Sequence, residues 1–227
     1  MKSSLKEYIK KSHSKATKKQ KHYTMSNNTD VFIKDSLPEG FDLNYVLKKV
    51  EASIPSYLMH NVDTIYVGEF EEFVDRGINA AYKDGALYIT NIQDDEDDMI
   101  DDIVHETAHS VEEFAGNEIY GDGRVEEEFI GKRQRLFYFL REEGYEVYLK
   151  DFLDSSYSKE FDMFLYQDVG YALLTTLTMG LFVSPYAATS LREYFATGFD
   201  KYYLEDRRYL KNISPILFEK IEYISNL

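Results

Sequence analysis

The chain has 227 residues, a net charge of −15 and no cysteine, with 44% hydrophobic and 15% aromatic residues. This length and composition allow a substantial buried core, while the lack of cysteine excludes a disulfide framework and zinc sites built on thiolates. The negative charge disfavours nucleic-acid binding by the folded body and favours basic peptides through electrostatic steering.

The chain begins with a basic segment that differs from the rest. Residues 1–22 contain eight lysines and one glutamate, so the remaining residues are more acidic than the chain as a whole. The segment lacks the apolar stretch of a secretory signal. We predict that residues 1–24 form a flexible arm and residues 25–227 one domain. Alternatives for the arm are a basic anchor for nucleic acid or acidic surfaces, or a short propeptide.

The next part of the chain predicts a helix and a small sheet. Apolar residues three and four apart predict a helix from Asp42 to Glu51. Residues 64–67 read as a strand. Residues 80–82 and 86–90 flank an Asp-Gly pair and predict a hairpin.

A helix with two histidines is predicted after the hairpin. The acidic run 94–98 suits a helix N-terminus, and Gly116 offers a C-terminal stop. The helix carries the sequence HETAH at residues 105–109, an HExxH pattern. Its apolar stripe centres near Ile100 and Val111, so the histidines are not expected in the core.

The HExxH pattern suits a metal ion. His105 and His109 lie one turn apart, about 40° from each other around the axis, so both imidazoles can reach one ion. Glu106 lies on an adjacent face, where it can hold a water on that ion. The alternative is two solvated histidines on a surface helix.

Helices are also predicted in the rest of the chain. Residues 125–141 show helical apolar spacing. Residues 161–182 are apolar-rich, and the nearly uncharged part, 171–183, is too short to span a bilayer. We predict a buried helix there, near the floor of the site. Ser214 and Pro215 predict the N-cap and first residue of a last helix.

Glu193 is the candidate third ligand. A catalytic zinc site needs three protein ligands and an open position for water. Glu193 opens a helical pattern with Phe195, Phe199 and Tyr202. Ser190 through Glu193 also spells a capping box, in which the glutamate bonds back to the Ser190 backbone. These residues alone leave both interpretations open.

The remaining candidates have less support. Glu112 and Ala115 occupy the glycine and histidine positions of the extended HExxHxxGxxH pattern, which excludes it. His13 and His22 lie in the basic arm and are predicted to be solvated. His60 is a potential ligand without a supporting pattern.

A second acidic residue follows the motif. Glu113 falls on the His109 side of the helix, where a carboxylate can orient a metal-binding imidazole. A solvated helix face is the favoured interpretation of this residue.

HETAH together with the pattern Y-x6-E-Y-F-A-x-x-F, which begins at Tyr186, resembles the catalytic domain of anthrax lethal factor and its relatives, which are gluzincin-type zinc metallopeptidases. In that family a tyrosine precedes the ligand glutamate by seven positions, as Tyr186 precedes Glu193 here. Residues 214–224 also resemble the family's final helix. The resemblance is one of motifs and covers the last half of the chain.

The resemblance implies that His105, His109 and Glu193 bind Zn²⁺. It implies that Glu106 acts as general base and that Tyr186 donates a hydrogen bond to the developing oxyanion. We therefore expect a predominantly helical α+β fold that is zincin-like, with a small sheet ahead of the HExxH helix. The edge strand of that sheet is expected to pair with a substrate backbone.

The expected function is that of a zinc-dependent metalloendopeptidase acting on peptides or proteins. One alternative is a catalytically silent zinc-binding or assembly module. Another is an interaction protein that binds no metal and uses its basic arm. The sequence leaves the substrate, the oligomeric state and the cellular location open.

Overall fold

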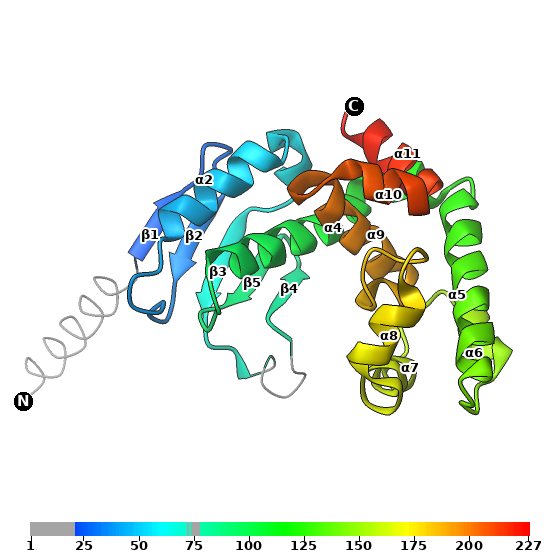
Figure 1. Ribbon diagram of the computed structural model, residues 1–227. Helices are drawn as coiled ribbons and strands as arrows, with labels where there is room; N and C mark the ends of the chain where they lie inside the picture. Colours follow the sequence, from blue (N-terminus) through cyan, green and yellow to red (C-terminus); the bar gives the residue numbers. More distant parts are fainter. Residues whose placement is uncertain (1–20, 72, 74–77) are drawn as a thin grey trace, which may run out of the picture.

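The computed structural model describes residues 21–71, 73 and 78–227, so most of the predicted arm, including His13, lies outside the described residues. The described residues form a predominantly helical α+β fold with a five-stranded sheet in the N-terminal half (Figure 1). The strands are β1 (Lys21–Thr24), β2 (Asp30–Ile33), β3 (Thr64–Gly68), β4 (Ala80–Lys83) and β5 (Ala86–Thr90). The helices beside this sheet are α2 (Leu43–Ser53), the 3₁₀ turn η1 (Ser56–Met59) and α4 (Glu96–Tyr120).

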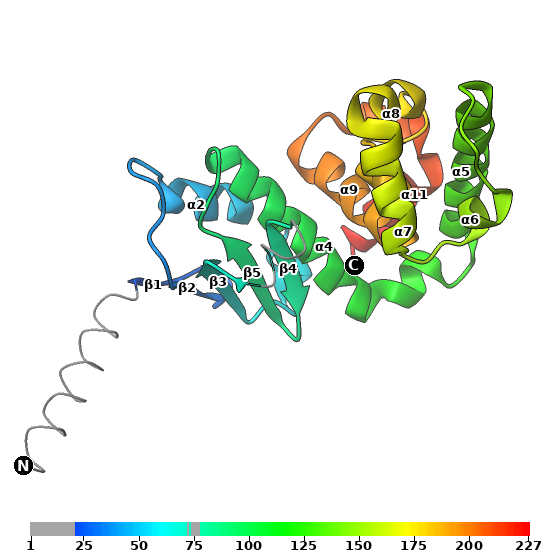
Figure 2. The ribbon, with the colours of Figure 1, turned by 90° about the horizontal axis from the view of Figure 1, so that it is seen from below.

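Helices make up the C-terminal half of the fold. Seen from below, α4 leads from the sheet into these helices (Figure 2). They are α5 (Arg124–Glu142), α6 (Leu149–Leu153), α7 (Lys159–Met163), the π-helix η2 (Phe164–Gly170), α8 (Tyr171–Thr178), the 3₁₀ turn η3 (Tyr186–Ala188), α9 (Leu191–Leu204), α10 (Arg207–Ile213) and α11 (Pro215–Ile224). Within the described residues, no helix has both the length and the apolar character needed to cross a membrane.

The sheet confirms the predicted strand and hairpin. Its order is β1-β2-β3-β5-β4, with β2, β3 and β5 parallel and the edge strands β1 and β4 antiparallel to their neighbours. Asp84 and Gly85 connect β4 to β5 with φ angles of 50° and 80°. Positive φ at both central residues is the conformation of a type I′ turn, which matches the twist of paired strands.

Strands β1 and β2 were not predicted from the sequence. In β2, Val31 and Ile33 are buried and alternate with partly buried side chains, which is the pattern of a half-buried strand. The strand is only four residues long, so it leaves little periodicity to detect. Strand β1 contains the last four residues of the predicted arm, Lys21–Thr24, and pairs with β2.

The two faces of the sheet differ. Side chains such as Ile65 and Leu87 are fully buried and belong to the same core as the α4 residue Ile103. The opposite face carries a row of stacked rings, one from each of four strands. The ring centroids are 4.7 Å apart for His22 and Phe32, 5.7 Å for Phe32 and Tyr66, and 5.4 Å for Tyr66 and Tyr88. Cross-strand ring pairs of this kind stabilise strand pairing.

Helix α4 is longer than predicted. It starts as expected, with the Asp95 side chain accepting a hydrogen bond from the Asp98 backbone N–H. It continues past Gly116 to Tyr120, because Ile119 is fully buried and extends the apolar face by another turn. A glycine within a helix costs only about 1 kcal/mol, which this packing offsets. Gly121 is the C-cap.

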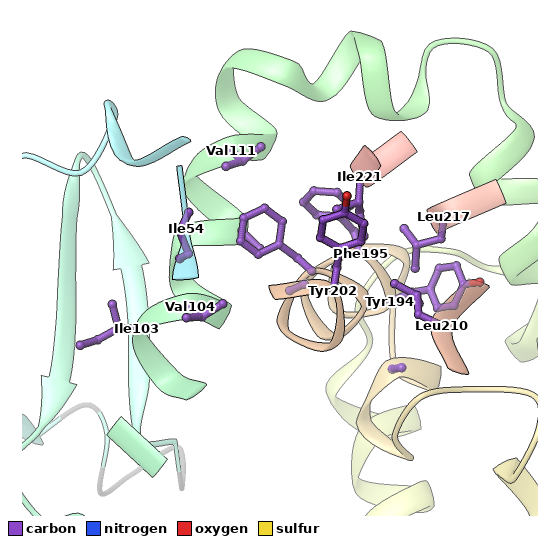
Figure 3. Packing of buried hydrophobic residues seen from close by; sticks show 14 of the residues in the cluster. Ile54, Ile103, Val104, Val111, Tyr194, Phe195, Tyr202, Leu210, Leu217 and Ile221 are labelled. Carbon is purple, nitrogen blue, oxygen red and sulfur yellow. The ribbon is translucent and has the colours of Figure 1, made fainter. Parts of the chain in front are cut away.

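Helices α4, α9 and α11 pack together in the centre of the protein. The α9 rings of Phe195 and Tyr202 lie between Val104 of α4 and Ile221 of α11 (Figure 3). Gly198 permits the close approach of α9 and α11, since a Cβ atom there would lie 2.4 Å from Cδ2 of Leu217.

The last helix begins at Pro215 as predicted, but Ser214 does not cap it through its hydroxyl. That hydroxyl accepts a hydrogen bond from Nζ of the buried Lys132. The carboxylate of Glu128 on α5 accepts the free backbone N–H groups of Ile216 and Leu217 instead. Acceptors at a helix N-terminus satisfy amides that have no partner within the helix.

The prediction of one buried helix within residues 161–182 was wrong. The stretch is divided into α7, η2 and α8, and Gly170, with φ of 79°, lies where η2 meets α8. Tyr171 is 45% exposed and Met179 is 72% exposed. Uncharged residues such as Thr175 also lie at the surface, where the Thr175 hydroxyl donates to the Tyr171 carbonyl of the same helix.

Candidate metal centre

The three residues predicted to bind metal lie together. His105 and His109 project from α4, and Glu193 lies in the first turn of α9, which packs beside α4. Oε2 of Glu193 is 2.9 Å from Nε2 of His105 and 3.6 Å from Nε2 of His109. Within the described part of the chain, this is the one group of three potential ligands whose donor atoms all lie within 4.8 Å of one another.

These separations can be compared with those around a metal ion. Zinc bonds to imidazole nitrogen and carboxylate oxygen are about 2.0–2.2 Å long, which places two ligands of a tetrahedral ion roughly 3.3–3.6 Å apart. The His109–Glu193 separation matches this range, whereas the His105–Glu193 separation is shorter, at hydrogen-bond length. Two neutral imidazoles and one carboxylate are also a ligand set that leaves a position open for water or substrate. The three residues therefore form a group that could hold a metal ion.

The local sequence leaves the carboxylate of Glu193 free for this role. Ser190 is the N-cap of α9, and its hydroxyl accepts a hydrogen bond of 3.2 Å from the Glu193 backbone N–H. In a full capping box the glutamate side chain would turn back to the serine backbone. Here that side chain instead reaches across to His105.

Each histidine is held by a second carboxylate. Nδ1 of His105 donates to Oδ2 of Asp200 at 3.0 Å, and Nδ1 of His109 donates to Oε2 of Glu112 at 2.9 Å. Both imidazoles therefore present Nε2 toward Glu193. Carboxylates in this position fix the tautomer and orientation of a metal-binding imidazole.

Asp200 was not predicted from the sequence. It lies seven residues after Glu193, two turns along the same face of α9. One face of α9 thus supplies both the carboxylate near Nε2 and the carboxylate at Nδ1 of His105. The seven-residue spacing is the signal that could have identified it.

Glu112 is the second residue that the analysis did not assign. It orients His109, and it also accepts hydrogen bonds from Tyr120 Oη at 2.6 Å and from Arg192 Nε at 2.9 Å. Glu113, the candidate for the orienting role, instead accepts a hydrogen bond from Tyr82 Oη. Glu112 therefore joins the two helices beside the ligands.

Glu106 is positioned for proton transfer. Its side chain is buried, and Oε2 accepts the backbone N–H of Tyr82 on β4 at 2.6 Å. Burial raises the pKa of Glu106, and the neighbouring histidines and the Tyr82 N–H only partly offset this effect. A raised pKa brings a carboxylate closer to the neutral range in which a general base works best.

Tyr186 lies at the edge of the same group. It opens η3, just before α9, and its ring centroid is 6.1 Å from that of His105. Burial and the negative charge of Glu193 raise the pKa of its phenol well above the ordinary value. The hydroxyl therefore stays protonated at neutral pH and remains a hydrogen-bond donor.

The electrostatic environment favours a cation at the histidines. Burial alone would lower the pKa of His109, but hydrogen bonds to Glu112 and Glu193 raise it to about 9. The same type of contact, to Asp200 and Glu193, raises the pKa of His105. Metal binding requires neutral imidazoles, so a metal ion competes with protons for this position.

The histidines do lie outside the apolar stripe of α4, yet His109 is only 8% exposed. The packing of α9 against α4 covers it, which the pattern of a single helix could not predict. The other candidates lie elsewhere. His60 packs against Phe114 with the ring centroids 4.3 Å apart and the rings tilted by 59°, and His22 pairs with Asp30 on the sheet.

Comparisons of the chain with protein-family models, with curated proteins and with solved structures gave no match.

Proposed function

We propose that this protein is a zinc metalloendopeptidase of gluzincin type. The observation that carries the proposal is the convergence of His105, His109 and Glu193 beside the buried carboxylate of Glu106. A site used only to hold metal needs no buried glutamate next to the ligands. Hydrolysis needs one, because a base must take a proton from the attacking water.

Each group would have its own role in the proposed hydrolysis. Zinc, when bound, would polarise the peptide carbonyl and make a bound water more acidic. Glu106 would accept the proton of that water and pass it on to the leaving amine. The Tyr186 hydroxyl would donate a hydrogen bond to the oxygen on which negative charge develops. A single donor of this kind typically contributes about 3 kcal/mol.

Strand β4 supports the choice of an extended peptide as substrate. It is an edge strand, and it lies directly against Glu106 through the Tyr82 N–H. The unpaired backbone groups of an edge strand bind extended peptides by adding a strand. The acidic chain favours peptides with basic residues.

The ligand set is tested by zinc content. The purified wild-type protein should hold about one zinc ion per chain, measured by mass spectrometry after removal of free metal. His109→Ala and Glu193→Ala should each lose it, because each removes one of three ligands. His60→Ala and Glu142→Ala are matched controls outside the site and should retain it. A wild-type protein that takes up no zinc would overturn the proposal.

The catalytic role is tested with Glu106→Gln. This variant keeps the size of the side chain and all three ligands, so it should retain zinc. It should also lose nearly all cleavage in a peptide-library screen, because an amide cannot accept the proton. A Gln variant as active as the wild type would refute the role of Glu106. Zinc binding without any cleavage by the wild type would indicate a silent zinc-binding module.

A further inference from the structure

Tyr82 on the edge strand β4 is held by α4 at two points. Its backbone N–H donates to Oε2 of Glu106 at 2.6 Å, and its phenol hydroxyl donates to Oε2 of Glu113 at 2.7 Å. Tyr82 thus connects the candidate general base to a second carboxylate on the same helix.

The spacing on α4 explains how one residue can meet both carboxylates. Residues seven apart on a helix share a face and lie about 10.5 Å apart along the axis. The Tyr82 side chain lies along this face of α4, with its backbone at Glu106 and its hydroxyl at Glu113. The ladder with β5 holds β4 along one edge, and these two contacts tie the strand to α4 as well.

The strand so held has free backbone groups. Asn79 O accepts from Thr90 N at 2.8 Å, so this pair forms hydrogen bonds within the hairpin. Hydrogen-bonded and non-hydrogen-bonded pairs alternate along an antiparallel ladder. Ala80 and Tyr82, paired with Ile89 and Leu87, therefore direct their N–H and C=O groups away from β5. One of these groups, the Tyr82 N–H, donates its hydrogen bond to Glu106.

We propose that the contact between the Tyr82 hydroxyl and Glu113 sets the register of β4 relative to Glu106. A peptide that pairs with the free Ala80 N–H and C=O and the free Tyr82 C=O would then arrive with its scissile carbonyl beside the general base. Tyr82 is in this sense a positioning residue, and its role rests on the proposed peptidase function. The role would account for the hydrogen bond between Tyr82 and Glu113, an exposed residue of α4.

The first measurement is amide hydrogen exchange at residue 82 in the full chain. Tyr82→Phe removes only the hydroxyl and should speed exchange of the residue 82 amide by about tenfold, as expected for losing a hydrogen bond to a charged group. Glu113→Ala should have the same effect, and Glu113→Gln should restore slow exchange because its amide oxygen still accepts the hydroxyl. Tyr88→Phe is the matched control, since that ring lies on the opposite face of the sheet.

The second measurement is cleavage of a peptide returned by the library screen. Tyr82→Phe and Glu113→Ala should lower kcat without changing zinc content, and Glu113→Gln should recover it. If Tyr82→Phe does not fold, Glu113→Ala and Glu113→Gln decide the result, because Glu113 is exposed and outside the core.

Four outcomes would count against the positioning role. Unchanged exchange in Tyr82→Phe and Glu113→Ala would overturn it, as would faster exchange with unchanged cleavage. A wild-type protein without zinc and without cleavage would overturn the proposed function and this role with it. An active wild type with equally active variants would overturn the positioning role alone.

Discussion

Asp200 offers a sharp test of the candidate metal centre. Its Oδ2 atom accepts Nδ1–H of His105 at 3.0 Å, while Glu193 lies at the other nitrogen of the same ring. Asp200→Asn keeps the shape of the side chain and an oxygen that can accept this hydrogen bond, but it removes the charge. We expect zinc affinity to fall about 10- to 100-fold, the usual effect of removing such a partner.

The expected loss can be placed on an energy scale. A 10- to 100-fold change in dissociation constant corresponds to about 1.4–2.7 kcal/mol. The structure favours the upper part of this range, because only 23% of the Asp200 side chain is exposed and water therefore screens its negative charge only in part. Its Oδ1 atom is also buried without a hydrogen-bond partner among the described residues. The carboxylate of Asp200 thus interacts mainly with His105.

The assay is a competition titration of zinc between the protein and a fluorescent chelator of known affinity. Asp168→Asn is the matched control, since it removes a carboxylate from the exposed surface of η2. Affinity of Asp200→Asn within twofold of the wild type would refute the reasoning. It would mean that His105 is oriented by the packing of α4 and α9 alone.

Four further predictions concern stability. Burial raises the pKa of Asp102 to about 6. Folding therefore favours the protonated carboxyl, so its effect on the unfolding free energy is fully stabilising below about pH 4 and is lost as the pH rises through 6. Asp102→Asn should remove this drop, which is on the order of 2 kcal/mol, from the pH profile of the unfolding free energy. Gly198→Ala should lower the unfolding free energy by about 1–3 kcal/mol in a urea titration, because the new methyl overlaps Leu217. Gly131→Ala on α5, which meets no atom within 4 Å, should instead raise it by up to about 1 kcal/mol. Glu128→Ala should lower the melting temperature through a loss of about 1–3 kcal/mol, since it leaves amides at the start of α11 unpaired; an unchanged melting temperature would contradict that capping role.

The sequence predicted those elements that leave a local signal. The hairpin was visible because an Asp-Gly pair separates two apolar runs, and the start of α4 was visible because acidic residues precede it. Periodicity also located α2 and α5 to within two residues at each end. It failed for residues 161–182, where a lack of charge was interpreted as burial.

The candidate site was predictable to the extent that its residues follow a motif. His105, Glu106 and His109 are adjacent in sequence, and their placement on one helix follows from the spacing alone. The meeting of His105 with Asp200 depends on how α9 packs against α4. The same holds for the contact between Tyr82 and Glu106. Such contacts are set by tertiary packing. The seven-residue spacing of Glu193 and Asp200 shows that the two residues share a face of α9, but it does not show which residue of another helix they meet.

The candidate ligands are also synthesised at different times. Proteins are synthesised from the N-terminus, so His105 and His109 leave the ribosome well before Glu193, with α5 to α8 emerging between them. A nascent chain that ends before α9 has the sheet and both histidines but neither Glu193 nor Asp200. Of the three candidate ligands it can offer an ion only the two imidazoles, so we expect tight capture of metal to be a late event in biogenesis. Under the proposed peptidase function, an unfinished chain would then not yet cleave neighbouring proteins.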